Sequence, residues 1–241
     1  MTVTSFFKAV GDFFLPQICL FCGKEGRAGG RYPVCETCVA EFLPLGGPRC
    51  PSCGKPLLAG SDSHLCGECL RDPPIFERAW SLFPYEGKVR HLIHLFKFRG
   101  DLAAVSVIRF LLEEIVSLPE VDADVVVPVP MDPQALKNRG YNQALMIATL
   151  LARLRKIPVD RFHLIKSRKT LPQVGLTKSE RKRNVQGAFS VTKREVFIGK
   201  KVLLVDDVFT TGATIQACSR ALKRGGASRI DVLTLARVVS G

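Results

Sequence analysis

The chain has 241 residues, of which 46% are hydrophobic and 24% are charged, and its formal net charge at pH 7 is +13. This length exceeds that of one usual domain, so one large domain or two unequal domains are expected. The apolar content is that of a globular protein with a sizeable core, and it includes no membrane span, because Arg109, Glu113 and Glu114 interrupt the apolar segment 102–118.

The N-terminal segment 1–16 predicts a short amphipathic helix. Its apolar residues recur at helical spacing, namely Phe6, Phe7, Val10, Phe13 and Phe14. The helix is expected to pack on the body of the protein, and the alternative is a position on a membrane surface. A secretory signal peptide is not expected, because a basic first region is missing and Lys8 and Asp12 divide the apolar stretch.

Eight of the nine cysteines form four Cys-x-x-Cys pairs: Cys19 and Cys22, Cys35 and Cys38, Cys50 and Cys53, and Cys66 and Cys69. Two thiolates three residues apart on a tight turn can hold one tetrahedral ion, and two such turns complete a four-sulfur zinc site. Two zinc ions are therefore expected, with disulfides or an iron–sulfur cluster as less favoured alternatives. Pairing of the first turn with the second and of the third with the fourth is the simplest arrangement, and an interleaved cross-brace is the alternative.

Two further residues bear on the metal sites and on the cellular location. The ninth cysteine, Cys218, is expected to be a small core residue on a helix. His64 lies two residues before Cys66 and is expected to be an exposed loop residue rather than a ligand. Thiolate sites in a chain without a secretory signal indicate the reducing cytoplasm, and the inner face of the membrane is a second location to consider.

The breaker Asp72-Pro73-Pro74 predicts a domain boundary, with an N-terminal helix and double zinc ribbon in residues 1–73 and a second domain in residues 74–241. Within the second domain, strands are expected at 79–87, 125–128, 162–165, 202–208 and 230–239, and helices at 87–98, 102–117, 144–154 and 215–224. The remaining segments are expected to be a polar turn at 131–143, a mobile loop at 166–186 and a hairpin at 188–197. Strands that alternate with helices predict a parallel α/β domain.

The run VLLVDDVFTTGAT, residues 202–214, is the most informative part of the chain. A buried strand ends in Asp206 and Asp207, and a turn of hydroxyls and glycine then leads into a helix. Backbone N–H groups and hydroxyls at a helix N-terminus favour a phosphate, and ligands of open α/β sheets bind at the carboxyl ends of strands. Because acids beside a phosphate would repel it, they are expected to hold sugar hydroxyls or Mg²⁺. The alternative is an ordinary strand with solvated acids and a threonine N-cap.

Positive charge is concentrated in one part of the chain. Residues 1–73 contain seven basic and seven acidic residues, whereas residues 137–201 contain 17 Lys or Arg against three acids. An excess of this size favours a polyanionic partner, and nucleic acid is the candidate. The alternative is a solvated basic surface that keeps the protein soluble.

Five stretches, in this order along the chain, resemble the ComF-type phosphoribosyltransferase-like family: the double zinc ribbon, 85–101, 128–143, 168–189 and 202–214. The last stretch also resembles the thirteen-residue signature of type I phosphoribosyltransferases. The resemblance implies an α/β fold, a type I phosphoribosyltransferase-like parallel sheet of five strands flanked by helices and preceded by a small zinc-ribbon domain. It also implies association with natural competence or with the use of DNA as a nutrient, and a cytoplasmic competence ATPase or helicase as a partner.

The resemblance further implies a site for phosphoribosyl pyrophosphate (PRPP) with Mg²⁺. Asp206 and Asp207 would hold the ribose hydroxyls, and the turn would hold the 5-phosphate through Thr210, Thr211, Gly212, Ala213 and Thr214. The basic candidates for the pyrophosphate and for a closing loop are Lys137, Arg139, Arg168 and Lys169. No catalytic residue is assigned, and Asn142 at a helix start suits ligand contact and simple capping equally.

Two functions remain open. In the first, the protein takes part in DNA uptake, has a PRPP-type nucleotide site and handles internalised single-stranded DNA. In the second, it is an active phosphoribosyltransferase that acts on a small nitrogenous base or amine. The intact motif favours a working ligand site in both cases, and the basic charge favours the first function.

Overall fold

The computed structural model describes residues 18–25, 32–58, 62–98, 102–170 and 177–239. These residues form two compact units, one from the described parts of 1–43 and 86–116 and the other from those of 44–85 and 117–241. The amphipathic helix predicted in segment 1–16 lies outside the described residues, and the domain boundary after residue 73 stays a prediction. No helix in the described ranges has the length and apolar character needed to cross a membrane.

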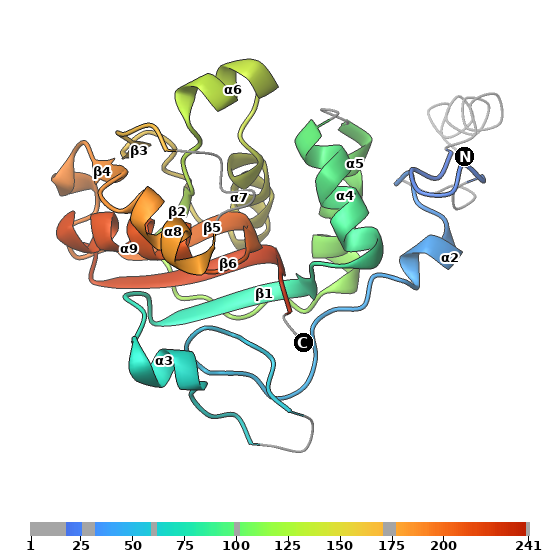
Figure 1. Ribbon diagram of the computed structural model, residues 1–241. Coiled ribbons are helices and arrows are strands. Elements are labelled where there is room, and N and C mark those ends of the chain that lie inside the picture. The colour runs from blue at the N-terminus through green and yellow to red at the C-terminus, as the bar shows by residue number, and fades with distance from the viewer. Residues whose placement is uncertain (1–17, 26–31, 59–61, 99–101, 171–176, 240–241) are drawn as a thin grey trace. The chain divides into compact units, whose positions relative to one another are not determined.

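A parallel sheet forms the centre of the second unit (Figure 1). Its strand order is β1 (Arg78–Pro84), β6 (Arg229–Arg237), β5 (Lys201–Phe209) and β2 (Val125–Pro128). Leu204 of β5 pairs with Val127 of β2 on one side and with Val232 of β6 on the other. The strand that contains the acidic pair is therefore an interior strand, as its continuous apolar run predicted.

The sheet has four strands within the described residues, so the number of five implied by the family resemblance is wrong here. Next to β2, Val159 makes only a single parallel bridge to Val126. The N–H of Val126 donates to Pro158 O at 2.8 Å, and the N–H of Asp160 donates to Val126 O at 2.9 Å. Because Pro158 has no N–H, it cannot donate a hydrogen bond to β2. The pairing of this segment with β2 is confined to Val159.

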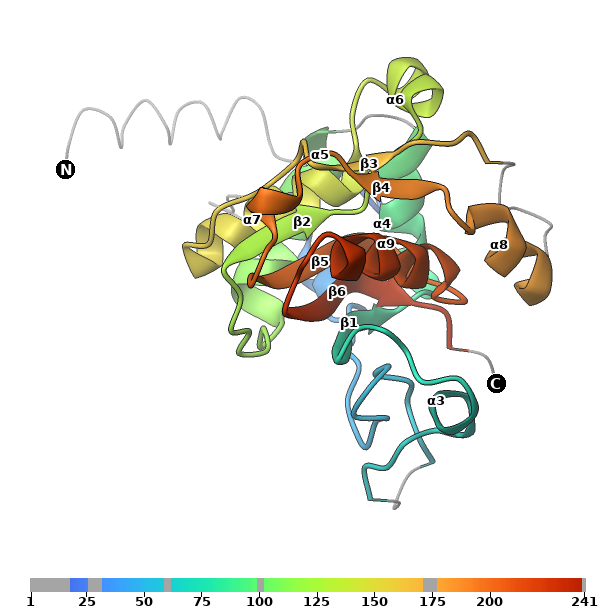
Figure 2. The same cartoon turned by 90° about the vertical axis from the view of Figure 1, so that its left-hand side faces the viewer.

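Helices cover both faces of the sheet. Val202 of β5 belongs to the core cluster beneath α9 (Ala213–Arg224), and the next residue, Leu203, faces the opposite side because side chains alternate along a strand. α9 packs on β5 and β6, and α7 (Gln143–Arg155) packs on β2 and β5 from the other side (Figure 2). This is the parallel α/β fold with flanking helices that the sequence predicted.

The segment 131–143 contains a helix, so the prediction of a polar turn was wrong. α6 (Pro133–Arg139) begins after Asp132, whose Oδ1 accepts hydrogen bonds from two backbone N–H groups of the first turn at 3.0 and 3.4 Å. It ends at Gly140, whose φ of 83° is the left-handed conformation common after a helix. These capping signals were present in the sequence, but the helix is too short and polar to show apolar periodicity.

The expected mobile loop 166–186 also contains a helix, α8 (Lys178–Val185). It starts with a capping box, in which Thr177 Oγ1 accepts from Glu180 N at 3.3 Å and Glu180 Oε2 accepts from Thr177 N at 2.8 Å. The prediction was therefore wrong for α8, which lacks an apolar face from which a helix could be recognised. Residues 171–176 of the same segment lie outside the described residues.

The predicted hairpin at 188–197 was also wrong. β4 (Phe189–Val191) pairs antiparallel with β3 (Leu164–Lys166), and a 3₁₀ turn, η2 (Arg194–Val196), follows it. The partner strand lies on the far side of α8 in the sequence. A pattern confined to neighbouring residues could not identify it.

The first unit combines the first zinc ribbon with three helical segments, α4 (Gly87–Phe98), α5 (Leu102–Phe110) and a π-helical turn η1 (Leu111–Ile115). These segments agree with the helices expected at 87–98 and 102–117. The ribbon, which includes the short helix α2 (Glu36–Val39), is anchored on them by Tyr32. Its hydroxyl donates to Glu113 Oε2 at 2.6 Å, and its ring centroid lies 5.1 Å from that of Phe110.

Candidate functional site

The eight paired cysteines form two four-sulfur clusters, Cys19, Cys22, Cys35 and Cys38 in the first and Cys50, Cys53, Cys66 and Cys69 in the second. All ligand sulfurs of a cluster lie within 4.8 Å of one another. One Sγ–Sγ distance in each cluster, Cys22 to Cys35 and Cys53 to Cys66, is 3.7 Å. Sulfurs about 2.3 Å from a tetrahedral zinc ion are about 3.8 Å apart. The clusters therefore fit two zinc sites with sequential pairing, and the cross-brace alternative is excluded.

The two ribbons share the same local backbone. The N–H of Gly23 donates to Cys19 O at 3.0 Å, and the N–H of Gly54 donates to Cys50 O at 2.9 Å. These glycines have φ values of 70° and 71°, in the left-handed region that glycine adopts without strain. A short helix, α2 in the first ribbon and α3 (Gly67–Arg71) in the second, begins directly after the third cysteine.

The surroundings of the thiols shift their pKa values in opposite directions. Burial by itself raises the pKa of Cys19, but backbone N–H groups that donate to its sulfur outweigh this effect and lower the pKa to about 6. The same balance lowers the pKa of Cys50 to about 6. Burial, followed by neighbouring sulfurs, raises the pKa of Cys38 to about 12. A divalent cation favours the thiolate form of all four ligands, so metal binding and proton release are coupled in each cluster.

Cys218 and His64 have the structural roles that the sequence predicted. Cys218 on α9 is fully buried, and burial raises the pKa of its thiol well above the usual value. His64 is exposed, and its Nδ1 lies 2.8 Å from the backbone oxygen of Asp62. It takes no part in the cysteine clusters.

The acidic pair lies near the carboxyl end of β5. Asp206 Oδ1 accepts a hydrogen bond from the N–H of Asp207 at 2.9 Å, and Asp207 Oδ1 accepts one from the N–H of Val208 at 2.8 Å. Asp207 is only 9% exposed, whereas Asp206 is half-buried. These local hydrogen bonds orient both carboxylates at the edge of the sheet where ligands of α/β folds bind.

The turn after β5 brings its hydroxyls to the N-terminus of α9. Gly212 is the N-cap, with a φ of 73°, and a Cβ built on it would lie 2.8 Å from the ring of Phe209. Only glycine therefore fits this position. Thr211 Oγ1 accepts from the N–H of Ala213 at 3.4 Å. N–H groups and hydroxyls gathered at a helix N-terminus suit a phosphate, and the assignment of each residue of 206–214 to a ligand atom stays a prediction.

Two of the four basic candidates, Arg139 and Arg168, donate hydrogen bonds to other residues of the same domain. The Arg139 Nη1 group donates to Gln143 Oε1 at 2.8 Å. The Arg168 Nη2 group donates to the backbone oxygens of Asn184 and Gln186, each at 2.9 Å, and so tethers the end of α8.

The other two candidates, Lys137 on α6 and Lys169 after β3, are exposed. Asn142 caps α7, because its Oδ1 accepts from the N–H of Ala144 at 3.0 Å. Its Nδ2 donates to Val129 O at 3.0 Å. Asn142 therefore has the capping role that was considered for it. The roles of the four basic residues toward a ligand stay predictions.

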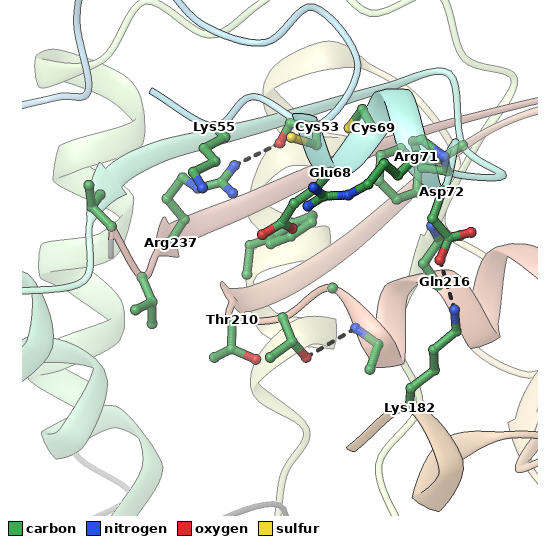
Figure 3. Close-up of a pocket in the computed structure, with 18 of the residues that line it drawn as sticks. Cys53, Lys55, Glu68, Cys69, Arg71, Asp72, Lys182, Thr210, Gln216 and Arg237 are labelled. Carbon is green, nitrogen blue, oxygen red and sulfur yellow. Dashed lines mark hydrogen bonds and ion pairs between the residues drawn. The ribbon is translucent and has the colours of Figure 1, made fainter. Parts of the chain in front are cut away.

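A pocket of about 360 Å³ opens beside the turn after β5. Lys55, Glu68 and Arg71 of the second ribbon lie on one side of it, and Thr210 lies across from them (Figure 3). The ribbon residues were not among those predicted from the sequence for this site. They are far from the turn in the sequence, and no local pattern indicates that they meet.

Arg237, the last residue of β6, was also missed. It is 4% exposed, its Nη1 donates to Cys53 O at 2.7 Å, and its guanidinium carbon lies 4.7 Å from the centroid of the Phe209 ring. Burial lowers its pKa, and the cysteines of the second cluster oppose this effect. The signal available in the sequence was an arginine within the apolar run LTLARVV.

Comparison with known families gives the class of protein to which this fold and site belong. A double zinc ribbon domain matches residues 10–70, and a phosphoribosyl transferase domain matches residues 134–241. The chain therefore combines a double zinc ribbon with a phosphoribosyltransferase-like domain.

The chain belongs to the ComF/YhgH family. It is 31% identical to the DNA utilization protein YhgH of Escherichia coli K12, over 93% of this chain and 99% of that protein. It is 31% identical to competence protein F of Haemophilus influenzae, over 90% and 93% of the two chains. It is 28% identical to the competence protein ComFC of Bacillus subtilis, over 85% and 84%. The resemblance noted from the sequence motifs is confirmed.

Proposed function

We propose that this protein binds PRPP or a related phosphoribosyl nucleotide with Mg²⁺ at the carboxyl end of β5, and that it handles single-stranded DNA during DNA uptake in the cytoplasm. A cytoplasmic competence ATPase or helicase is the partner proposed from the family. Asp206 and Asp207 hold the ribose hydroxyls and Mg²⁺, and residues 210–214 hold the 5-phosphate.

One observation carries the proposal for the ligand. The acidic pair and the N-terminus of the 12-residue helix α9 are separated only by residues 208–212. Carboxylates suit hydroxyls and Mg²⁺, whereas helix N–H groups suit a phosphate. A ligand that carries both a ribose and a 5-phosphate satisfies the two halves together.

Calorimetric titration with PRPP in the presence of Mg²⁺ tests this site. The double variant Asp206→Ala, Asp207→Ala is expected to lose PRPP binding while it keeps its fold. The matched control is Asp122→Ala, because Asp122 is an exposed acid whose Oδ2 pairs with Lys201 Nζ at the opposite end of β5 at 2.5 Å. Equal affinity of the wild type and the double variant would remove the assignment.

The proposal for DNA has separate support. Two relatives are named competence proteins and a third is named a DNA utilization protein. The basic region 137–201 of this chain places exposed cations on α8 and in the segment after β4, including Arg183 and Lys193. Cations that neutralise phosphates release counterions, so the affinity for single-stranded DNA should fall steeply as salt rises.

Fluorescence anisotropy with a labelled single strand, over a range of salt concentrations, tests the proposal for DNA. The double variant Arg183→Glu, Lys193→Glu is expected to bind more weakly and with a shallower salt dependence. The double variant Lys24→Glu, Arg90→Glu, at two exposed positions outside the basic region, is the control for an equal change of net charge. If the affinity of the wild type for single-stranded DNA does not change with salt, the basic region is a solvated surface and not a DNA-binding surface.

The second candidate function is phosphoribosyl transfer to a small nitrogenous base or amine. It is favoured by the pocket of about 360 Å³ beside the turn, which lies in the range of small-molecule sites. Pyrophosphate release from PRPP, screened over bases and amines with and without single-stranded DNA, separates the two functions. Release that depends on a base identifies a transferase, and binding without release identifies a nucleotide-binding protein of DNA uptake.

A further inference from the structure

The pocket beside the phosphate turn has walls from two parts of the chain that are distant in sequence. One wall is the second zinc ribbon, with Lys55 and Arg71 among its side chains (Figure 3). The other consists of the turn after β5, from Thr210 to Ala213, and the adjacent side of α9, with Gln216 and Arg220. The pocket therefore continues from the predicted phosphate site along α9, beneath the ribbon.

The charges that line the pocket favour an anion. Five cationic side chains face two carboxylates: Lys55, Arg71, Lys182, Arg220 and Arg237 against Glu68 and Asp72. Lys182 Nζ contacts Asp72 Oδ2 at 2.7 Å, so α8 and the end of the ribbon meet across the pocket. The N-terminus of α9 adds further positive potential at the same place.

The ribbon wall is held on the sheet by short backbone contacts. The N–H of Ala79 in β1 donates to Ser52 O at 2.7 Å. A Cβ built on Gly54 would lie only 2.3 Å from the oxygen of Ala79, so the ribbon turn touches the strand directly. Ile75, which follows the ribbon, donates its N–H to Gln216 Oε1 on α9 at 3.1 Å.

A chain of contacts also joins the second metal cluster to the phosphate turn. Arg237 donates to the backbone oxygen of the ligand residue Cys53 and lies over the ring of Phe209. That ring occupies the space where a Cβ of Gly212 would be. The position of the ribbon and the conformation of the turn are therefore coupled through buried groups.

We propose that the second zinc ribbon is a ligand-binding element. It provides one wall of the pocket beside the 5-phosphate turn, Lys55 and Arg71 bind the anionic ligand from this wall, and zinc at Cys50–Cys69 holds the wall in place. No described residue of the first ribbon lines this pocket, so the role is assigned to the second ribbon. This inference rests on the proposed function, because it takes a phosphorylated ribose compound as the ligand of the site.

The test compares equivalent positions of the two ribbons, with PRPP as the probe and calorimetry as the readout. Lys55 and Lys24 occupy the same position after the second cysteine of their ribbons. We expect Lys55→Glu combined with Arg71→Glu to lower the affinity for PRPP about tenfold or more, with two zinc ions still bound. Lys24→Glu, in the first ribbon, is expected to leave the affinity unchanged.

A second arm removes one zinc at a time. Cys66→Ser changes the third ligand of the second cluster, and Cys35→Ser changes the third ligand of the first. Metal analysis should find one zinc per chain in each, and only Cys66→Ser is expected to weaken PRPP binding. If Cys66→Ser does not fold, the charge variants still decide the question.

The outcomes separate this inference from the proposed function. If the wild type binds PRPP and the Lys55→Glu, Arg71→Glu variant binds it with the same affinity, the role of the ribbon is overturned. The proposed site then stays intact. Absence of PRPP binding by the wild type overturns the proposed site and the inference with it. Loss of affinity in the ribbon variant with retention in Lys24→Glu supports both.

Discussion

The two zinc ribbons have the same cysteine spacing and the same turn, but their surroundings differ. In the first, Phe21 packs edge-on against Phe42 and against His91 of α4, with ring centroids 5.4 and 5.7 Å apart. In the second, Gly54 touches β1, and Arg237 of β6 donates to a cluster residue. One ribbon thus belongs to a helical unit and the other to the sheet that carries the phosphate turn.

This difference shows that ligand spacing specifies a metal site but not its role. Cysteine pairs three residues apart need only a local turn to bind a metal, and both ribbons have that turn. The role follows from the residues that contact the ribbon from elsewhere in the chain. Variants at matched positions test whether the second ribbon differs from the first in these contacts.

The largest effect is expected from loss of a metal ligand. Structural zinc contributes on the order of 10 kcal/mol to the folding of small ribbons, so Cys66→Ser and Cys35→Ser should each unfold their own ribbon. Because the second ribbon contacts β1 and β6, Cys66→Ser should also lower the thermal stability of the sheet unit. Hydrogen exchange of β1 measures this, and equal protection of β1 in the two variants would contradict the comparison.

Acid should release zinc from both ribbons. The thiols with raised pKa, Cys38 at about 12 and Cys53 at about 11, must lose a proton when zinc binds at neutral pH. Zinc affinity should therefore rise with pH by at least one proton per cluster. Below about pH 6, where Cys19 and Cys50 also become protonated, the dependence should steepen. Competition with a chromophoric chelator over pH 5 to 8, a range that brackets these values, measures it.

The glycines of the two turns should respond differently to alanine. Each substitution introduces strain of roughly 1–2 kcal/mol at positive φ. Gly54→Ala adds a collision with the backbone oxygen of Ala79, so we expect it to lower the free energy of unfolding by about 3 kcal/mol or more in total. Among the described residues nothing lies within 4 Å of a Cβ at Gly23, so Gly23→Ala should show only the strain.

Urea unfolding of the zinc-loaded proteins compares the two glycine variants. The slope of the transition should be the same for both, so that the midpoints report stability. A similar loss of unfolding free energy in the two variants would mean that Gly54 of the second ribbon is not in close contact with β1.

A smaller effect is expected at Arg237. Arg237→Lys keeps the charge but loses the planar group that stacks on Phe209 and donates to Cys53 O. We expect a loss of about 2 kcal/mol of unfolding free energy. Lys88→Ala is the comparison for the first ribbon, because Lys88 on α4 places its Nζ 3.2 Å from Glu41 Oε1 and 5.7 Å from the centroid of the Phe21 ring. The loss of unfolding free energy caused by Lys88→Ala should be smaller than that caused by Arg237→Lys in the same urea measurement.

The smallest effect should come from the ion pair between Asp72 and Lys182. Both side chains are largely exposed, at 74% and 60%. Exposed pairs contribute about 0–1 kcal/mol, so Asp72→Asn should change stability by no more than this. The effect should shrink further at high salt. A loss of several kcal/mol in a thermal scan would show that this contact holds the ribbon to α8.

The sequence predicted much of the fold because the relevant signals are local. The apolar run before Asp206, the helical spacing of 87–98 and the four cysteine pairs each depend on residues within a few positions. The errors at α6 and α8 concern short polar helices, where capping residues are the only signal. The hairpin prediction failed because β4 pairs with β3, whose position depends on the folded chain.

By itself the sequence determined two metal clusters, a parallel α/β sheet and a turn suited to a phosphate. Each rests on chelation, burial or helix-end polarity within one short segment. Only the tertiary structure determined which cysteine pairs share a cluster and which ribbon reaches the phosphate turn. It placed Lys55 and Arg71 across a pocket from Thr210, and it placed Arg237 between Cys53 and Phe209. The physical reason is that such contacts depend on how strands and ribbon pack, which spacing along the chain does not encode.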